Sequence, residues 1–145
     1  MDRCKLANDY HDQGFNCSQS VLAAFSDLTG LSLQESCSIA GGFGGGAGTK
    51  ELCGAITGAV MTLGLLTPVD MADPVGSKKR TVALSKEFQT RFAGRFGALR
   101  CGDLLQNKVA PAEGTAAARL GIKGHCSIMI VTAVEIVEEM LSERA

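Results

Sequence analysis

Residues 52–66 read LCGAITGAVMTLGLL and form the longest apolar run of the chain. The run is shorter than the roughly 18 to 20 residues that a helix needs to cross a bilayer. It also contains Thr57 and Thr62. We therefore expect a buried core helix over residues 50–66, with Thr49 as its N-terminal cap.

Small residues are spaced along this predicted helix. Gly54, Gly58 and Gly64 would let another helix approach closely. Each glycine costs up to about 1 kcal/mol relative to alanine in a helix, so a compensating interaction is required. We expect either close helix contact or backbone space beside Cys53 to supply it.

The rest of the chain shows apolar residues at helical spacing and no alternating strand pattern. We expect an all-α fold, a compact helical bundle of about five to seven helices in a single domain spanning residues 1–145. Besides 50–66, the expected helices cover residues 2–13, 17–29, 32–40, 78–96, 101–106 and 126–142, and residues 115–120 are compatible with one more short helix.

Four of the six cysteines stand where helices are expected to begin, on the apolar side. They are Cys17, Cys53, Cys101 and Cys126. At a helix start the dipole and the unpaired N–H groups stabilise a thiolate, which prepares sulfur for electron transfer, disulfide exchange or metal ligation. The cysteines lie too far apart in sequence for a zinc finger, which uses tight pairs, so the fold must assemble any common site. We expect the four to converge at one end of the bundle.

Several stretches around these cysteines carry a resemblance to a known family. They are GFNCSQSV (14–21), GFGGG (42–46), CGAITG (53–58), RFG (95–97) leading to Cys101, and Cys126 with its helix. The chain resembles the C_GCAxxG_C_C family of redox-active proteins, named for this arrangement of cysteines. The resemblance implies a small prokaryotic helical protein whose redox site consists of Cys17, Cys53, Cys101 and Cys126.

The glycine-rich turn at 42–46 fits a dinucleotide-binding pattern only superficially, because a helix and not a strand is expected before it. We interpret it as a turn between helices with positive φ angles. Gly44, Gly45 and Gly46, with Gly54, are our candidate cofactor-binding positions, because glycine-rich turns can present N–H groups to a thiolate or an anion near Cys53.

Cys53 is expected to be the most reactive thiol, with a pKa below the free value of about 8.5. Burial beside Ile56 opposes this effect, but we expect the backbone donors to dominate. Cys4 lies in an exposed-looking helix and, like Cys37, is interpreted as structural. His125 precedes Cys126 and is either a base or metal ligand, or a merely exposed or capping residue.

Charge and cysteine content limit the setting and the partners. The 14 basic and 15 acidic residues give a formal net charge of -1, so nucleic acid is not expected as a partner. Six cysteines are too sparse for a secreted disulfide scaffold, and the N-terminus lacks the apolar core of a signal peptide. We expect a cytoplasmic protein without a membrane span. Its partner would be a redox protein or a small thiol or other electron donor, and a homodimer is possible.

Three function classes remain open. The first is a redox protein, a possible thiol-dependent oxidoreductase, in which the four cysteines cycle between dithiol and disulfide. The second is an iron-sulfur or other metal carrier that uses the same four thiolates as metal ligands. The third is a structural or interaction protein with inert core cysteines.

Overall fold

Helices account for 69% of the protein in the computed structural model, which describes residues 1–144. Six of the ten helical segments have seven or more residues and the others are shorter. The expected all-α class is therefore confirmed, and the number of segments slightly exceeds the expected range. The segments are α1 (Arg3–Asp12), α2 (Cys17–Ala23), α3 (Ser26–Thr29), α4 (Leu33–Ala40), the π-helical turn η1 (Gly46–Lys50), α5 (Gly54–Leu65), α6 (Pro74–Phe96), α7 (Cys101–Gln106), α8 (Ala116–Arg119) and α9 (His125–Glu143).

The helix expected over residues 17–29 is divided in the structure. Its first part, α2, begins with a complete capping box, in which Asn16 accepts from the Gln19 amide and Gln19 accepts from the Asn16 amide. The backbone leaves helical angles at Phe25, after which α3 adds one turn and ends at Gly30 in the left-handed region. The apolar spacing predicted one continuous helix here and did not predict the break.

The core helix begins later than expected. Lys50 has a φ of 60°, outside the helical region, and α5 starts only at Gly54. Thr49 does not cap this helix, because its hydroxyl donates to the carbonyl of Gly46 at 3.2 Å. The expected Thr49 cap is therefore wrong, and Cys53 itself occupies the N-cap position.

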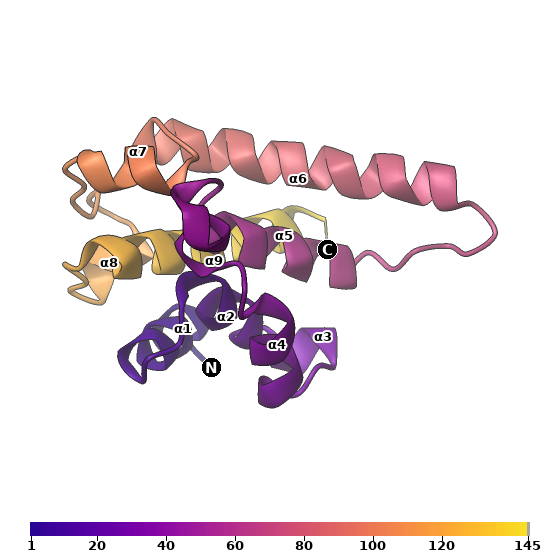
Figure 1. Cartoon of the computed structure of the whole chain (residues 1–145), viewed down its shortest axis with the longest axis horizontal. Coiled ribbons are helices and arrows are strands. Elements are labelled where there is room, and N and C mark those ends of the chain that lie inside the picture. The colour runs from indigo at the N-terminus through magenta and orange to yellow at the C-terminus, as the bar shows by residue number, and fades with distance from the viewer. Residues whose placement is uncertain (145) are drawn as a thin grey trace.

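The helices lie in three layers (Figure 1). The long α6 runs along one side, α5 and α9 lie in the middle, and α1, α2, α3 and α4 form the opposite side. The most extensive packing joins α2 to α5 and α1 to α9. One apolar cluster connects residues from α1, α2, α5, α6, α7, α8 and α9. The middle layer therefore supplies the core, as the apolar run at 52–66 predicted.

Helix α6 is attached to α9 by two kinds of contact. Its Phe88 and Phe92 are fully buried, with ring centroids 6.0 Å apart. Beside them, Arg95 reaches Glu135 at 2.6 Å and Glu139 at 2.9 Å on α9. The aromatic residues supply the buried area, and the ion pairs add contacts at the edge, where solvent limits their contribution to stability.

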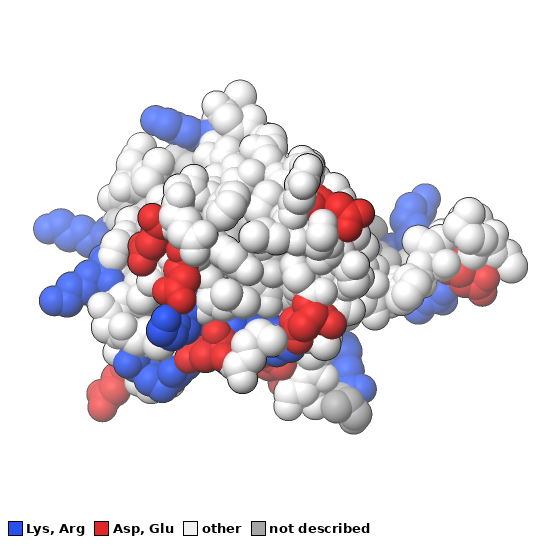
Figure 2. Space-filling view, turned by 90° about the horizontal axis from the view of Figure 1, so that it is seen from below, with Lys and Arg blue, Asp and Glu red and all other residues white. Residues whose placement is uncertain are grey.

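Charged side chains are gathered at the margin of the face shown in Figure 2, whose centre is largely uncharged. Basic and acidic groups are interspersed along this margin. Among residues 1–144, none of the helices combines the length and the apolar character required to cross a bilayer.

Candidate functional site

The four cysteines at helix starts line one pocket of about 350 Å³. We call it the cysteine pocket. Its lining residues are Cys17, Cys53, Cys101 and Cys126, the apolar Leu104, Leu105 and Met129, the glycines Gly45, Gly48 and Gly54, and Lys50 and His125. The expected convergence of the four sulfur-bearing residues is therefore found, while their roles in a reaction stay predictions. All four are free thiols.

Gly54 brings the first two cysteines together. A Cβ at this position would lie 3.2 Å from the Cβ of Cys17 and 3.0 Å from the carbonyl oxygen of Phe43. Only a residue without a side chain lets the start of α5 approach the start of α2 so closely. The close helix contact expected from the glycine spacing is confirmed here, and it places Cys17 beside the residue that follows Cys53.

A short antiparallel pairing brings in the third cysteine. Leu52 and Arg100 form an isolated bridge, the one β-type pair within residues 1–144. The Cys53 amide donates to the Leu99 carbonyl at 2.9 Å, and the Cys101 amide donates to the Glu51 carbonyl at 2.6 Å. This pairing holds the entries to α5 and α7 side by side, although the two segments are far apart in sequence.

Cys126 is the second residue of α9, and its side chain shares a hydrogen bond with Cys17. This bond lowers the pKa of Cys126 below that of an ordinary thiol, with burial acting against the shift. The same bond is the largest cause that raises the pKa of Cys17, followed by burial and by the charges of the other cysteines. Within this pair the two shifts favour the thiolate at Cys126 and the thiol at Cys17.

Cys53 behaves differently from the expectation. Burial raises the pKa of Cys53 to about 11, although the amides of Ala55 and Ile56 act to lower it. Only 5% of the residue is exposed. The expected pKa below the free value is therefore wrong, because loss of hydration outweighs the two backbone donors. The low-pKa thiol of the pocket is Cys126, which sequence reasoning placed in the site but did not single out.

Cys101 is half-buried at the first position of α7. Burial, with the nearby charge of Cys126, raises its pKa, and the Lys50 ammonium acts in the opposite direction. Lys50 was not among the residues that the sequence suggested. Its position in the glycine-rich segment, three residues before Cys53, was the available signal.

The candidate glycines have two different roles. Gly45 and Gly54 line the pocket, as does Gly48, which the sequence analysis did not select. Gly44 and Gly46 do not line the pocket. Close packing explains why glycine stands at these two positions. A Cβ at Gly44 would lie 2.4 Å from Cγ of Asn16, and a Cβ at Gly46 would lie 2.3 Å from the backbone nitrogen of Glu51.

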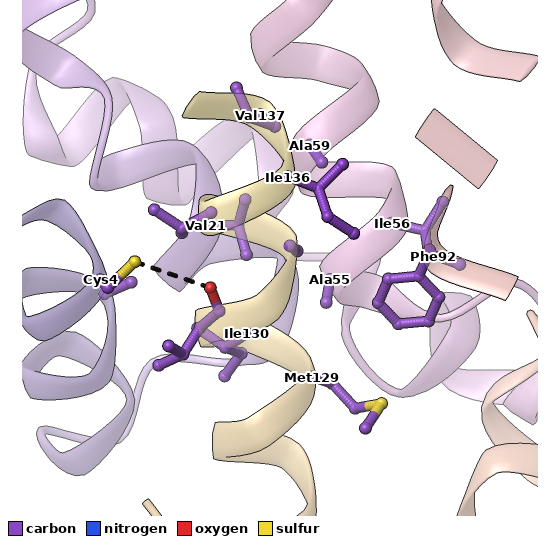
Figure 3. Packing of buried hydrophobic residues seen from close by; sticks show 14 of the residues in the cluster. Cys4, Val21, Ala55, Ile56, Ala59, Phe92, Met129, Ile130, Ile136 and Val137 are labelled. Atoms are coloured by element: carbon purple, nitrogen blue, oxygen red, sulfur yellow. Dashed lines mark hydrogen bonds between the residues drawn. The ribbon is translucent and has the colours of Figure 1, made fainter. Parts of the chain in front are cut away.

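Cys4 and Cys37 lie outside the cysteine pocket, as expected. Cys4 is nevertheless buried and not exposed, which corrects the expectation for its helix. Its sulfur lies 3.7 Å from the carbonyl oxygen of Val131 on α9 (Figure 3). Burial, reinforced by the charge of Glu138, raises the pKa of Cys4 to about 12. This thiol is part of the core that Figure 3 shows.

The donor groups of the cysteine pocket decide whether it fits a metal ion. Within residues 1–144, no three cysteine, histidine, aspartate or glutamate side chains lie close enough together to hold an ion. The four thiols share the pocket without forming a ready coordination sphere of the kind that zinc or an iron-sulfur cluster requires.

Comparison with known proteins gives one match. The family model described as "Putative redox-active protein (C_GCAxxG_C_C)" matches residues 15–140. No curated protein and no solved structure matches the chain.

Proposed function

Because this chain belongs to the C_GCAxxG_C_C family, we propose that the cysteine pocket is a thiol-disulfide redox site to which Cys17, Cys53, Cys101 and Cys126 all contribute. One observation carries the proposal: all four cysteines line one pocket, in which the interaction with Cys17 lowers the pKa of Cys126. A thiolate beside a thiol is the arrangement that thiol-disulfide exchange requires.

Cys126 supplies the attacking thiolate. It attacks one sulfur of a partner disulfide, and the S–S bond of the partner breaks as a mixed disulfide forms on Cys126. The second sulfur of the partner leaves as a thiolate. Its departure is favoured where the leaving thiol has a low pKa.

Cys17 then resolves the mixed disulfide. The largest cause of its raised pKa, the neighbouring Cys126 thiolate, is removed once Cys126 is covalently bound. Cys17 loses its proton more easily in that state, and His125, which also lines the pocket, is the base that we assign to accept it. Attack of Cys17 on the Cys126 sulfur forms the Cys17–Cys126 disulfide and releases the partner sulfur that was bound to Cys126 as a thiolate. Two electrons thereby pass from the protein to the partner.

Cys53 and Cys101 form the second pair of the site in this proposal. The Leu52–Arg100 bridge holds their backbones in place, and both pKa values are raised. Thiols with raised pKa values attack slowly at neutral pH, so this pair acts after Cys17 and Cys126. We place the reaction in the cytoplasm, where resting thiols are reduced.

Peptide mapping under non-reducing conditions tests the proposal. The reduced protein is treated with a small disulfide, the remaining thiols are blocked, and linked peptides are identified by mass spectrometry. We expect a Cys17–Cys126 link first, its loss in Cys126→Ser, and its retention in Cys37→Ala. Failure to form any link among the four pocket cysteines would contradict the redox function.

Anaerobic purification tests the metal-carrier alternative. A colourless protein with four titratable pocket thiols is expected. Visible absorbance together with stoichiometric iron would instead favour an electron carrier that uses the same four thiolates.

A further inference from the structure

The walls of the cysteine pocket are informative about what it binds. Leu104, Leu105 and Met129 lie beside the four thiols, and the cavity of about 350 Å³ has the size of a small-molecule site. Leu105 is also 49% exposed, so this wall reaches the surface of the protein. An aliphatic group can therefore enter from solvent and cover the apolar wall.

A single cation faces this apolar pocket. Among the lining residues that the structure describes, Lys50 is the one lysine, arginine or carboxylate. Its positive charge acts on a thiol of the pocket. It acts to lower the pKa of Cys101, against the effect of burial. An anionic group of a ligand would be attracted to the same place.

The backbone holds Lys50 in an unfavourable conformation. Its φ is 60°, and the preceding turn contains Ala47 with a φ of 58° between glycines that also have positive φ. Residues that bear side chains are disfavoured in this region and persist where the surroundings fix them. Here the turn fixes the base of the lysine side chain at the pocket.

We propose that the cysteine pocket takes a small disulfide with an aliphatic body and a carboxylate, the carboxylate at Lys50 and the aliphatic part against Leu104, Leu105 and Met129. This inference rests on the redox function proposed above and names its substrate class. Large disulfides with several charges exceed the pocket and would leave charges against its apolar wall.

The reaction balances with this substrate as the oxidant. The Cys126 thiolate attacks one substrate sulfur, the substrate S–S bond breaks, and its second sulfur leaves as a thiolate. The Cys17 thiol loses its proton to His125, and the resulting thiolate attacks the Cys126 sulfur and displaces the first substrate sulfur. The products are the Cys17–Cys126 disulfide and the reduced substrate, which gains two electrons and takes up two protons at its sulfurs.

Binding is tested with octanoate, an aliphatic carboxylate that cannot undergo disulfide exchange. The probe is titrated into the reduced protein by calorimetry, and the Met129 methyl signal is followed by NMR. We expect Lys50→Gln to weaken binding on the order of tenfold, since a charge-assisted hydrogen bond is lost. Lys50→Arg should retain most of the affinity, and Lys78→Ala, on the exposed part of α6, should not change it. Equal binding to wild type and Lys50→Gln overturns the inference.

Reaction is tested with lipoic acid, an aliphatic cyclic disulfide with a carboxylate, against its neutral amide, lipoamide. The reduced protein should reduce lipoic acid faster than lipoamide, and Lys50→Gln should remove the difference. If the protein reduces both equally, the substrate class is wrong while the redox function stands. If octanoate binds through Lys50 but neither disulfide is reduced, the redox function fails and the disulfide is overturned as the ligand.

Discussion

Leu52 pairs with Arg100 in an antiparallel bridge, and this one pair sets the geometry of two of the four cysteines. The residues that flank the bridge donate through their amides, Cys53 to Leu99 and Cys101 to Glu51. The pairing joins the entry of α5 to the entry of α7 through the backbone. The site is therefore positioned by backbone hydrogen bonds as well as by helix packing.

The bridge should be visible in amide hydrogen exchange. We expect the Cys53 and Cys101 amides to be protected, since both donate to carbonyls across the bridge. Lys108, in the segment after α7, is the matched reference, because residues 1–144 supply no hydrogen-bond acceptor for its amide. Exchange measured by NMR on the reduced protein decides the point. Cys53 and Cys101 amides that exchange as fast as Lys108 would show that the bridge does not persist in solution.

The contact between α2 and α5 should be sensitive to a single methyl group. A Cβ at Gly58 would lie 2.7 Å from the Ser18 carbonyl oxygen and 3.1 Å from the Val21 Cβ. Because the nearest of these atoms is backbone, α2 must move, and we expect Gly58→Ala to lower the free energy of unfolding by about 1 to 3 kcal/mol. Denaturant titration monitored by circular dichroism measures it.

Gly64 on the same helix provides the control. A Cβ there would meet only the Thr81 Cγ2, at 3.8 Å. Gly64→Ala should therefore be neutral or stabilising by up to about 1 kcal/mol, from helix propensity alone. If both substitutions changed stability in the same direction and by the same amount, close packing at Gly58 would not be the cause.

The helical class and the cysteine pocket could be predicted because both depend on local patterns. Apolar spacing reports which face of a helix is buried, and Cys17, Cys101 and Cys126 stand at helix starts that capping and turn residues indicate. The break at Phe25 and the late start of α5 were not predictable in this way. The late start of α5 depends on the bridge at Leu52 and on a turn with successive positive φ angles, which long-range contacts stabilise.

The choice of the reactive cysteine failed for a related reason. Cys53 has two backbone donors, as the Gly54 motif and helix start suggested, but its 5% exposure is a property of the whole fold. The low pKa of Cys126 arises from Cys17, more than a hundred residues away in sequence. Neither the depth of burial nor a hydrogen bond between distant residues can be derived from local spacing.

Cys4 should make stability decrease in alkaline solution. Its pKa is raised to about 12 in the folded protein, against about 8.5 for a free thiol in the unfolded chain. The unfolded chain therefore loses a proton above pH 8.5 that the folded protein keeps, so the stabilising effect is complete below that pH and is lost as pH rises toward 12. One such thiol contributes a slope of about 1.4 kcal/mol per pH unit.

Comparison with Cys4→Ala isolates this contribution. The variant should be less stable at neutral pH, because a buried side chain is truncated, but the free energy of unfolding should fall less steeply between pH 9 and 11. Cys37→Ala, at a half-buried position, should keep nearly the wild-type slope. Parallel curves for wild type and Cys4→Ala would mean that Cys4 ionises similarly in both states.

Cys126 should be the first cysteine of the pocket to be alkylated at neutral pH, because the hydrogen bond from Cys17 lowers its pKa. In Cys17→Ala that donor is lost while burial remains, so the Cys126 pKa should rise above its wild-type value. We expect alkylation by iodoacetamide at pH 7 to slow on the order of tenfold, less than the loss of thiolate alone would give, because nucleophilicity rises with pKa. Cys17→Ser keeps a hydroxyl donor and should restore most of the rate. Peptide mass spectrometry across pH 5 to 10 provides the measurement, and equal Cys126 profiles in wild type and Cys17→Ala would show that the Cys17 thiol does not stabilise the thiolate.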